Sequence, residues 1–97
     1  MSSFNETISL KTWQSATGSV GTSAAQLVDV LDKASGKGII IKNTHASQKL
    51  YIGDARVSAT KGFELGANES VELALQYANE VYVVGGGAST TYTWLSY

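Results

Sequence analysis

The single histidine, His45, is the first residue whose type could do chemistry, because imidazole serves as a metal ligand and as an acid or base. It lies in a short polar stretch, 43–46, between two apolar runs. A metal site needs three or four clustered oxygen, nitrogen or sulfur ligands, and the chain contains no cysteine. We therefore interpret His45 as a solvated turn residue and predict that the protein has no metal site and no cofactor.

Five of the eight carboxylates are the next candidates, since two neighbouring carboxyl groups can divide general acid and base work. They are Glu64, Glu69, Glu72, Asp29 and Asp32. Glu69 follows a turn signal and Glu72 alternates with apolar residues, so we expect both on solvent faces. The serines lack a histidine and an aspartate in a suggestive context, so no triad is indicated. The sequence predicts no catalytic residues and no enzyme activity.

A glycine run at 85–87 follows an expected strand and invites comparison with a phosphate-binding loop. It lacks the Gly-Lys-Ser or Gly-Lys-Thr ending of such a loop, and no helical pattern follows it. We interpret 85–87 as a hairpin turn, in which glycine tolerates positive φ.

Aromatic residues could form a platform on which sugars or bases stack. The candidates are Tyr77, Tyr82, Tyr92, Trp94 and Tyr97. Aromatic residues in strands more often belong to the core and to cross-strand pairs, so we favour a core role. A carbohydrate-binding module that presents the C-terminal aromatics remains an alternative.

The elements that position these residues are indicated by the stretch 50–75, where apolar residues recur two apart between glycine, asparagine and aspartate. This spacing predicts short strands that each bury one face, whereas a helix needs apolar residues three and four apart. The whole chain predicts an all-β fold, an antiparallel β-sandwich or small jelly-roll-like barrel of about seven to eight short strands. The clearest strands are 39–43, 50–52, 63–65, 71–75, 80–84 and 90–97.

The strand 39–43 contains three consecutive isoleucines, so we expect it inside a sheet and paired with 50–52 as a hairpin. Ile39 or Ile41, together with Val81 or Val83, should pack the core between two sheets. In 90–97, Tyr92, Trp94 and Ser96 should share one face. The zone 15–32 is ambiguous: a strand over 25–28 is favoured, and a helix remains the alternative.

Residues 1–14 differ from the rest, which we expect to form one β-sandwich domain over 15–97. Four large apolar residues, Phe4, Ile8, Leu10 and Trp13, are spaced irregularly there, and no turn signal folds them back. The segment predicts either an edge strand over 7–13 or an arm that docks on a partner. These four residues are our partner-contact candidates.

Charge and hydropathy narrow the range of partners. Seven basic residues against eight acidic ones leave almost no net charge, which argues against nucleic-acid binding, because nucleic-acid binders normally show a basic face. No apolar run approaches the roughly 20 residues that span a bilayer, and the first residues lack a signal-peptide pattern. We therefore expect no nucleic-acid partner, no membrane partner and assembly in the cytoplasm.

A string of turns and strands over about residues 20–97 resembles small β-domain virion proteins of tailed bacteriophages, of the head decoration, head fibre or tail-associated type. Its pieces are Lys42-Asn43, Tyr51-Ile52-Gly53, 62–65, 66–70 with Ala67-Asn68 inserted, and Val81-Tyr82. The resemblance implies a non-enzymatic structural protein of the virion, a capsid decoration or accessory protein that binds and stabilises the head. It also implies capsid or other virion proteins as partners and a homo-oligomer, with a trimer as one option. A tail, neck or fibre adaptor is the alternative.

Overall fold

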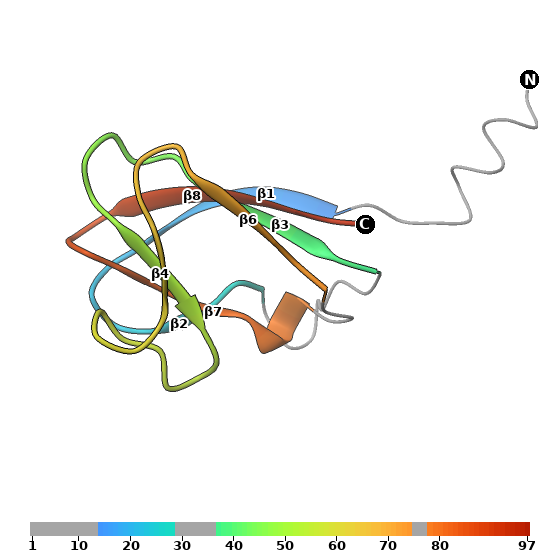
Figure 1. Ribbon diagram of the computed structural model, residues 1–97, viewed down its shortest axis with the longest axis horizontal. Helices are drawn as coiled ribbons and strands as arrows, with labels where there is room; N and C mark the ends of the chain where they lie inside the picture. Colours follow the sequence, from blue (N-terminus) through green and yellow to red (C-terminus); the bar gives the residue numbers. More distant parts are fainter. Residues whose placement is uncertain (1–13, 29–36, 75–77) are drawn as a thin grey trace, which may run out of the picture.

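The computed structural model describes residues 14–28, 37–74 and 78–97, which form eight β-strands in two antiparallel sheets (Figure 1). The strands are β1 Gln14–Val20, β2 Ala25–Gln26, β3 Ile39–Asn43, β4 Leu50–Gly53, β5 Phe63–Leu65, β6 Ser70–Leu73, β7 Tyr82–Gly85 and β8 Thr90–Ser96. One 3-10 turn, η2 Ala78–Glu80, precedes β7. The predicted all-β sandwich is confirmed.

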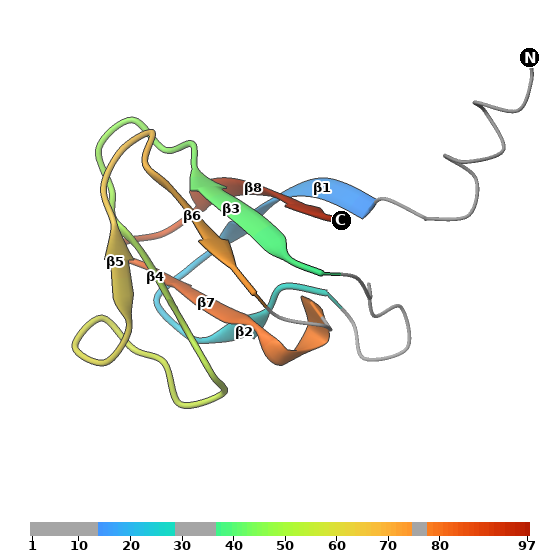
Figure 2. The ribbon, with the colours of Figure 1, turned by 45° about the vertical axis from the view of Figure 1, so that its right-hand side comes forward.

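The order of the strands is that of a jelly roll. One sheet runs β1-β8-β3-β6 and the other runs β2-β7-β4-β5 (Figure 2). The first strand pairs with the eighth, the second with the seventh, the third with the sixth and the fourth with the fifth. The chain therefore resembles one long antiparallel hairpin that is rolled up. The additional pairs β3–β8 and β4–β7 join the rolled strands into two four-stranded sheets.

Two expected hairpins are wrong, because consecutive strands cross from one layer to the other. β3 pairs with β6 and β8, whereas β4 pairs with β5 and β7, so residues 44–49 connect the sheets. Residues 86–89 likewise lead from β7 in one sheet to β8 in the other. A strand with one apolar face can bury it equally well in either layer, so alternation alone does not identify its neighbour.

The glycine run at 85–87 was expected to allow positive φ in a hairpin turn, but the structure shows a different reason for glycine there. No described glycine has a positive φ, a conformation found instead at Asn68 and Ser89. Gly85 is required by close approach, since a Cβ there would meet the side chain of Thr90 and the carbonyl oxygen of Val20. Glycine is thus needed at the end of β7, where the backbone lies too close to Thr90 and Val20 of the other sheet to leave room for a side chain.

The strand boundaries near 14 and 25 differ from the expected ones. β1 begins at Gln14, which pairs with Ser96, so this residue belongs to the sandwich and not to an N-terminal arm. The strand expected over 25–28 is confirmed for Ala25 and Gln26, where no helix forms. The candidates Phe4, Ile8, Leu10 and Trp13 and the possible edge strand 7–13 lie outside the described residues.

The core lies between the two sheets and confirms the predicted packing. Ile39, Ile41, Val81 and Val83 are all buried members of one hydrophobic cluster. Tyr92, Trp94 and Ser96 share one face of β8 as predicted, and this face is buried, while Thr93 and Leu95 are half-buried. The 3-10 turn η2 includes Glu80, where the strand was expected to begin, so β7 starts later, at Tyr82.

A buried hydroxyl gives a first testable prediction. Ser96 is 1% exposed, and its Oγ has no hydrogen-bond partner among the described residues. Because Ser96→Ala removes a polar group that forms no such bond, the free energy of unfolding should stay unchanged or rise by up to about 1 kcal/mol. Thr90→Val is the matched control on the same strand face, since Thr90 Oγ1 donates to Gln48 Oε1 at 2.5 Å. In urea unfolding, Ser96→Ala should destabilise less than Thr90→Val; the reverse order contradicts the prediction.

The tyrosine in the core gives a second prediction. Burial raises the pKa of the Tyr92 hydroxyl above its ordinary value of 10.0. The unfolded chain then loses this proton at lower pH than the folded chain. The contribution of Tyr92 to the free energy of unfolding is therefore fully present below about pH 10 and is lost as the pH rises through the pKa of the folded state. Urea midpoints measured between pH 9 and 11 should fall less for Tyr92→Phe than for the wild type. Equal slopes for the two proteins would show that Tyr92 is not responsible.

Candidate functional site: a hydroxyl-lined groove on the outer sheet face

The outer face of the sheet β1-β8-β3-β6 carries side chains that the register aligns in rows across all four strands. One row consists of Thr17, Thr93, Lys42 and Ser70. The neighbouring row consists of Ser15, Leu95, Ile40 and Glu72. These residues face away from the core because their neighbours in each strand, such as Ile41 and Trp94, face inward.

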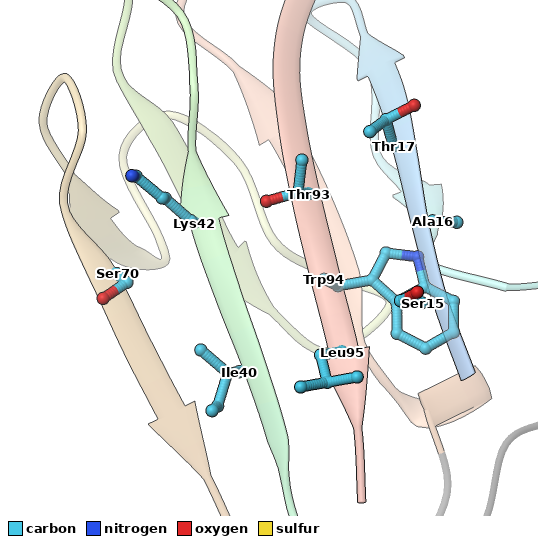
Figure 3. Close-up of a pocket in the computed structure, with 9 residues that line it drawn as sticks. All are labelled: Ser15, Ala16, Thr17, Ile40, Lys42, Ser70, Thr93, Trp94 and Leu95. Carbon is cyan, nitrogen blue, oxygen red and sulfur yellow. The ribbon is translucent and has the colours of Figure 1, made fainter. Parts of the chain in front are cut away.

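A groove with a volume of about 580 Å³ crosses these rows (Figure 3). It is lined by Ser15, Ala16, Thr17, Ile40, Lys42, Ser70, Thr93, Trp94 and Leu95. The lining combines four hydroxyl groups and the Lys42 ammonium with the apolar side chains of Ile40 and Leu95. The described lining thus offers hydrogen bonds, one positive charge and apolar contact, which suits binding to a surface of mixed polarity.

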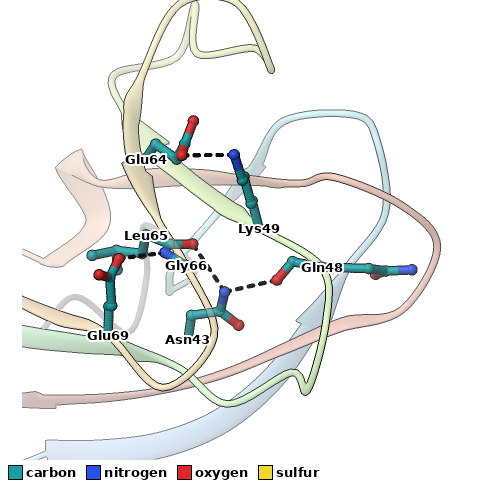
Figure 4. A network of polar contacts seen from close by, with 7 residues as sticks. All are labelled: Asn43, Gln48, Lys49, Glu64, Leu65, Gly66 and Glu69. Carbon is teal, nitrogen blue, oxygen red and sulfur yellow. Dashed lines mark hydrogen bonds and ion pairs between the residues drawn. The ribbon is translucent and has the colours of Figure 1, made fainter.

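At the end of β3, a buried asparagine holds this sheet to the connections around it (Figure 4). Asn43 is fully buried, and its side-chain amide donates to the carbonyl oxygens of Gln48 at 2.8 Å and Leu65 at 3.0 Å. Its Oδ1 accepts the backbone N–H of His45 at 2.9 Å. The backbone of Asn43 also bonds to that of Asn68 and Glu69. One residue therefore connects the 44–49 crossover, β5 and the turn before β6.

The histidine has a structural role in the crossover that follows. His45 is half-buried, and its Nδ1 accepts the backbone N–H groups of Ser47 at 3.1 Å and Gln48 at 2.9 Å. The interpretation as a turn residue is confirmed, but the turn is a crossover between sheets and the ring is not simply solvated. Instead, the ring accepts the N–H groups of Ser47 and Gln48, two residues of the connection that belong to no strand.

The described carboxylates that could have formed a catalytic pair lie apart in separate interactions. Glu64 forms an ion pair with Lys49 at 2.9 Å, and this hydrogen bond and charge raise the pKa of Lys49. Glu69 accepts the N–H of Gly66 at 2.6 Å and closes the turn before β6. Glu72 is exposed on the outer face, as expected. Asp29 and Asp32 lie outside the described residues.

The described residues contain neither a metal-binding cluster nor a membrane-spanning helix. Within 14–28, 37–74 and 78–97, no three histidine, cysteine or acidic side chains gather closely enough to hold a metal ion. In those same ranges, no helix has the length and apolar character needed to cross a membrane.

The aromatic residues do not form the exposed platform considered from the sequence. Tyr92 and Trp94 are 7% and 6% exposed and belong to the core cluster, which confirms the favoured core role for both. Tyr82 and Tyr97 are half-buried, and Tyr97 packs over Gly38, where an added Cβ would meet its ring. Tyr77 lies outside the described residues. The exposed aromatic that stands out is Phe63, at 58%.

Sequence reasoning missed the groove and proposed Phe4, Ile8, Leu10 and Trp13 instead. The signal that was missed is the set of residues that alternate with the core residues in each strand. In the last strand, alternation places Thr91, Thr93 and Leu95 on one face. What it does not show is that Ser15, Ile40 and Ser70 lie beside that face, because these residues come from three distant strands.

Comparison with known proteins gives no family assignment, since neither a protein-family model nor a curated protein matches the chain. Two solved structures match most of the chain, both with low scores. IMPa from Pseudomonas aeruginosa, solved in complex with an O-glycopeptide, is 17% identical with a TM-score of 0.49; the match covers 87% of this chain and 12% of IMPa. PirA is 16% identical with a TM-score of 0.41, and the match covers 88% of this chain and 92% of PirA. Scores below 0.5 carry no argument about the function of this chain.

Proposed function

We propose that this chain is a non-enzymatic structural protein of a phage particle, a capsid decoration or accessory protein that binds and stabilises the head. The observation that supports this most directly is the jelly-roll strand order of a chain whose residues 20–97 resemble phage virion β-domains. Jelly rolls recur in viral capsid domains. The mechanism is binding, since area buried across neighbouring capsid subunits makes their separation more costly.

The chemistry of the groove fits this role. Ser15, Thr17, Ser70 and Thr93 are short side chains, and one ammonium group, that of Lys42, accompanies them. Short hydroxyl-bearing side chains lose little conformational entropy when a partner covers them, whereas long charged ones lose more. A sheet face of this kind suits close packing against another protein subunit.

The carbohydrate-binding alternative loses its main support, because Tyr92 and Trp94 lie in the core and cannot stack on a sugar. A tail, neck or fibre adaptor would use the same surface chemistry as a head protein. Electron microscopy of particles with and without the protein would distinguish head from tail by the position of the lost density.

The proposal also assigns partner binding to the N-terminal segment, and this gives a third prediction. Deleting residues 1–13 leaves β1 complete, because that strand starts at Gln14. The truncated protein should keep its β-type circular dichroism and lose binding to heads purified from phage lacking the protein. Replacing Phe4, Ile8, Leu10 and Trp13 with serine in the full chain should have the same effect, since it removes the apolar contacts of the segment, including Trp13, and tryptophan is enriched among the residues that dominate binding energy.

Phe63→Ser is the matched control, because it removes an exposed aromatic from the described surface. It should leave binding to heads unchanged. Normal binding by the truncated protein would reject the arm as the contact, and absence of binding by the full chain would reject the head role itself.

A further inference from the structure

Strand β1 forms the longest edge of the sandwich, and no described strand pairs with its outer side. The edges are β1 and β6 in one sheet and β2 and β5 in the other. β1 has seven residues, whereas β6 has four, β5 has three and β2 has two. An edge strand presents a row of N–H and C=O groups without strand partners, and the number of such groups grows with strand length.

The described part of β1 also lacks the features that usually protect such an edge from pairing. Charges, proline, bulges and short length are the common protections. β6 carries Glu72, and β5 carries Glu64 in its ion pair with Lys49. β1 reads QSATGSV, without charge or proline, and it pairs with β8 through seven consecutive residues without a bulge. Four of its residues are exposed: Ser15, Ala16, Thr17 and Ser19.

We infer that β1 is an interaction edge whose partner is β1 of a second copy of this chain, paired antiparallel about a two-fold axis at Thr17. In this register Thr17 lies opposite Thr17 of the second copy, Ser15 opposite Ser19, and Ala16 opposite Gly18. Opposite residues of an antiparallel pair point to the same side, so outer-face hydroxyls meet outer-face hydroxyls. Cross-strand threonine and serine pairs are favourable, and no like charges oppose each other.

A second copy is favoured over an unrelated strand because the edge is complementary to itself. All seven residues overlap in the two-fold register, and an uncharged strand offers no charge pattern with which to select a different partner. Pairing joins the two four-stranded sheets into one continuous sheet and places both outer-face grooves on the same side. This inference goes beyond the proposed phage role and does not depend on it.

Disulfide trapping tests the register directly, because the chain contains no cysteine of its own. Directly opposite residues have Cα atoms about 4.5–5.5 Å apart, within the disulfide range of about 4.4–6.8 Å. Full-length Thr17→Cys should therefore become a covalent dimer on mild oxidation, seen on a non-reducing gel. Ser15→Cys is the matched control on the same strand face. Its two copies would lie four residues apart, about 13 Å, so it should stay monomeric on the gel.

Charge substitutions test the same axis in solution by sedimentation velocity. The wild type should be a dimer, whereas Thr17→Lys and Thr17→Glu should each be monomers, because like charges meet at the axis. An equimolar mixture of these two variants should recover the dimer. Thr91→Lys places the same charge on the same face of the interior strand β8 and should leave the dimer intact.

Three results would overturn the inference. The first is that the wild type stays a monomer at all concentrations. This result also covers the case in which the β1 edge pairs with a different protein instead of a second copy. The second is equal cross-linking of Thr17→Cys and Ser15→Cys. The third is a dimer that neither charge variant dissociates. Since cross-linking is measured on protein shown by circular dichroism to be folded, the test holds even where a charge variant fails to fold.

Discussion

Asn43→Ala is expected to lower the free energy of unfolding by roughly 3–5 kcal/mol, because it leaves buried polar groups without partners. The asparagine side chain is fully buried and makes three hydrogen bonds, to the carbonyls of Gln48 and Leu65 and from the N–H of His45. Each buried group left unsatisfied costs about 1–3 kcal/mol, so the sum is a large part of a small domain's stability. Urea unfolding followed by circular dichroism measures the change.

Thr44→Ala is the matched control for this experiment. Thr44 is the next residue along the chain, is exposed, and its Oγ1 donates to Thr91 Oγ1 at 3.1 Å on the protein surface. Surface substitutions of this kind change stability by about 0.5 kcal/mol or less. If the urea midpoint of Asn43→Ala moves no further than that of Thr44→Ala, the buried amide does not hold the crossover as described.

Ile41→Ala is expected to cost roughly 2–5 kcal/mol, the range for removing most of a buried aliphatic side chain and leaving a cavity. Ile41 is 0% exposed on an interior strand, between Val71 of β6 and Trp94 of β8. Close packing on both sides leaves little freedom for neighbours to fill the space.

Ile40→Ala provides a control of identical chemistry in the same strand. Ile40 is half-buried on the outer face, where it lines the groove, so its truncation opens no internal cavity. The urea midpoint should fall clearly less for Ile40→Ala than for Ile41→Ala. Equal falls would mean that the two faces of β3 are buried to the same extent in solution, contrary to the structure.

Local pattern was enough to predict which residues of a strand share a face. In the last strand, alternation alone separated Tyr92, Trp94 and Ser96 from Thr93 and Leu95, and the shared face is the buried one. The isoleucine run of β3 likewise indicated an interior strand, and β3 lies between β8 and β6. These features depend on a two-residue period within one segment, which the sequence displays directly.

Strand pairing could not be predicted in the same way. The expected hairpin of 39–43 with 50–52 was reasonable locally, since a polar turn joins two apolar strands. Rolling the chain into two layers places β3 beside β6 and β8 instead. Both layers bury the same kind of apolar face, so the choice depends on how all eight strands close together and on contacts such as those of Asn43.

The sequence by itself therefore determined the all-β class, which residues of β8 share a face, and the absence of cysteine chemistry. Only the tertiary structure decided the jelly-roll order, the length of the β1 edge and the position of the groove. The reason is distance along the chain: Ser15, Ile40, Ser70 and Thr93 become neighbours only after the sheet has formed. A surface assembled from such distant segments leaves no periodic signal within any one of them.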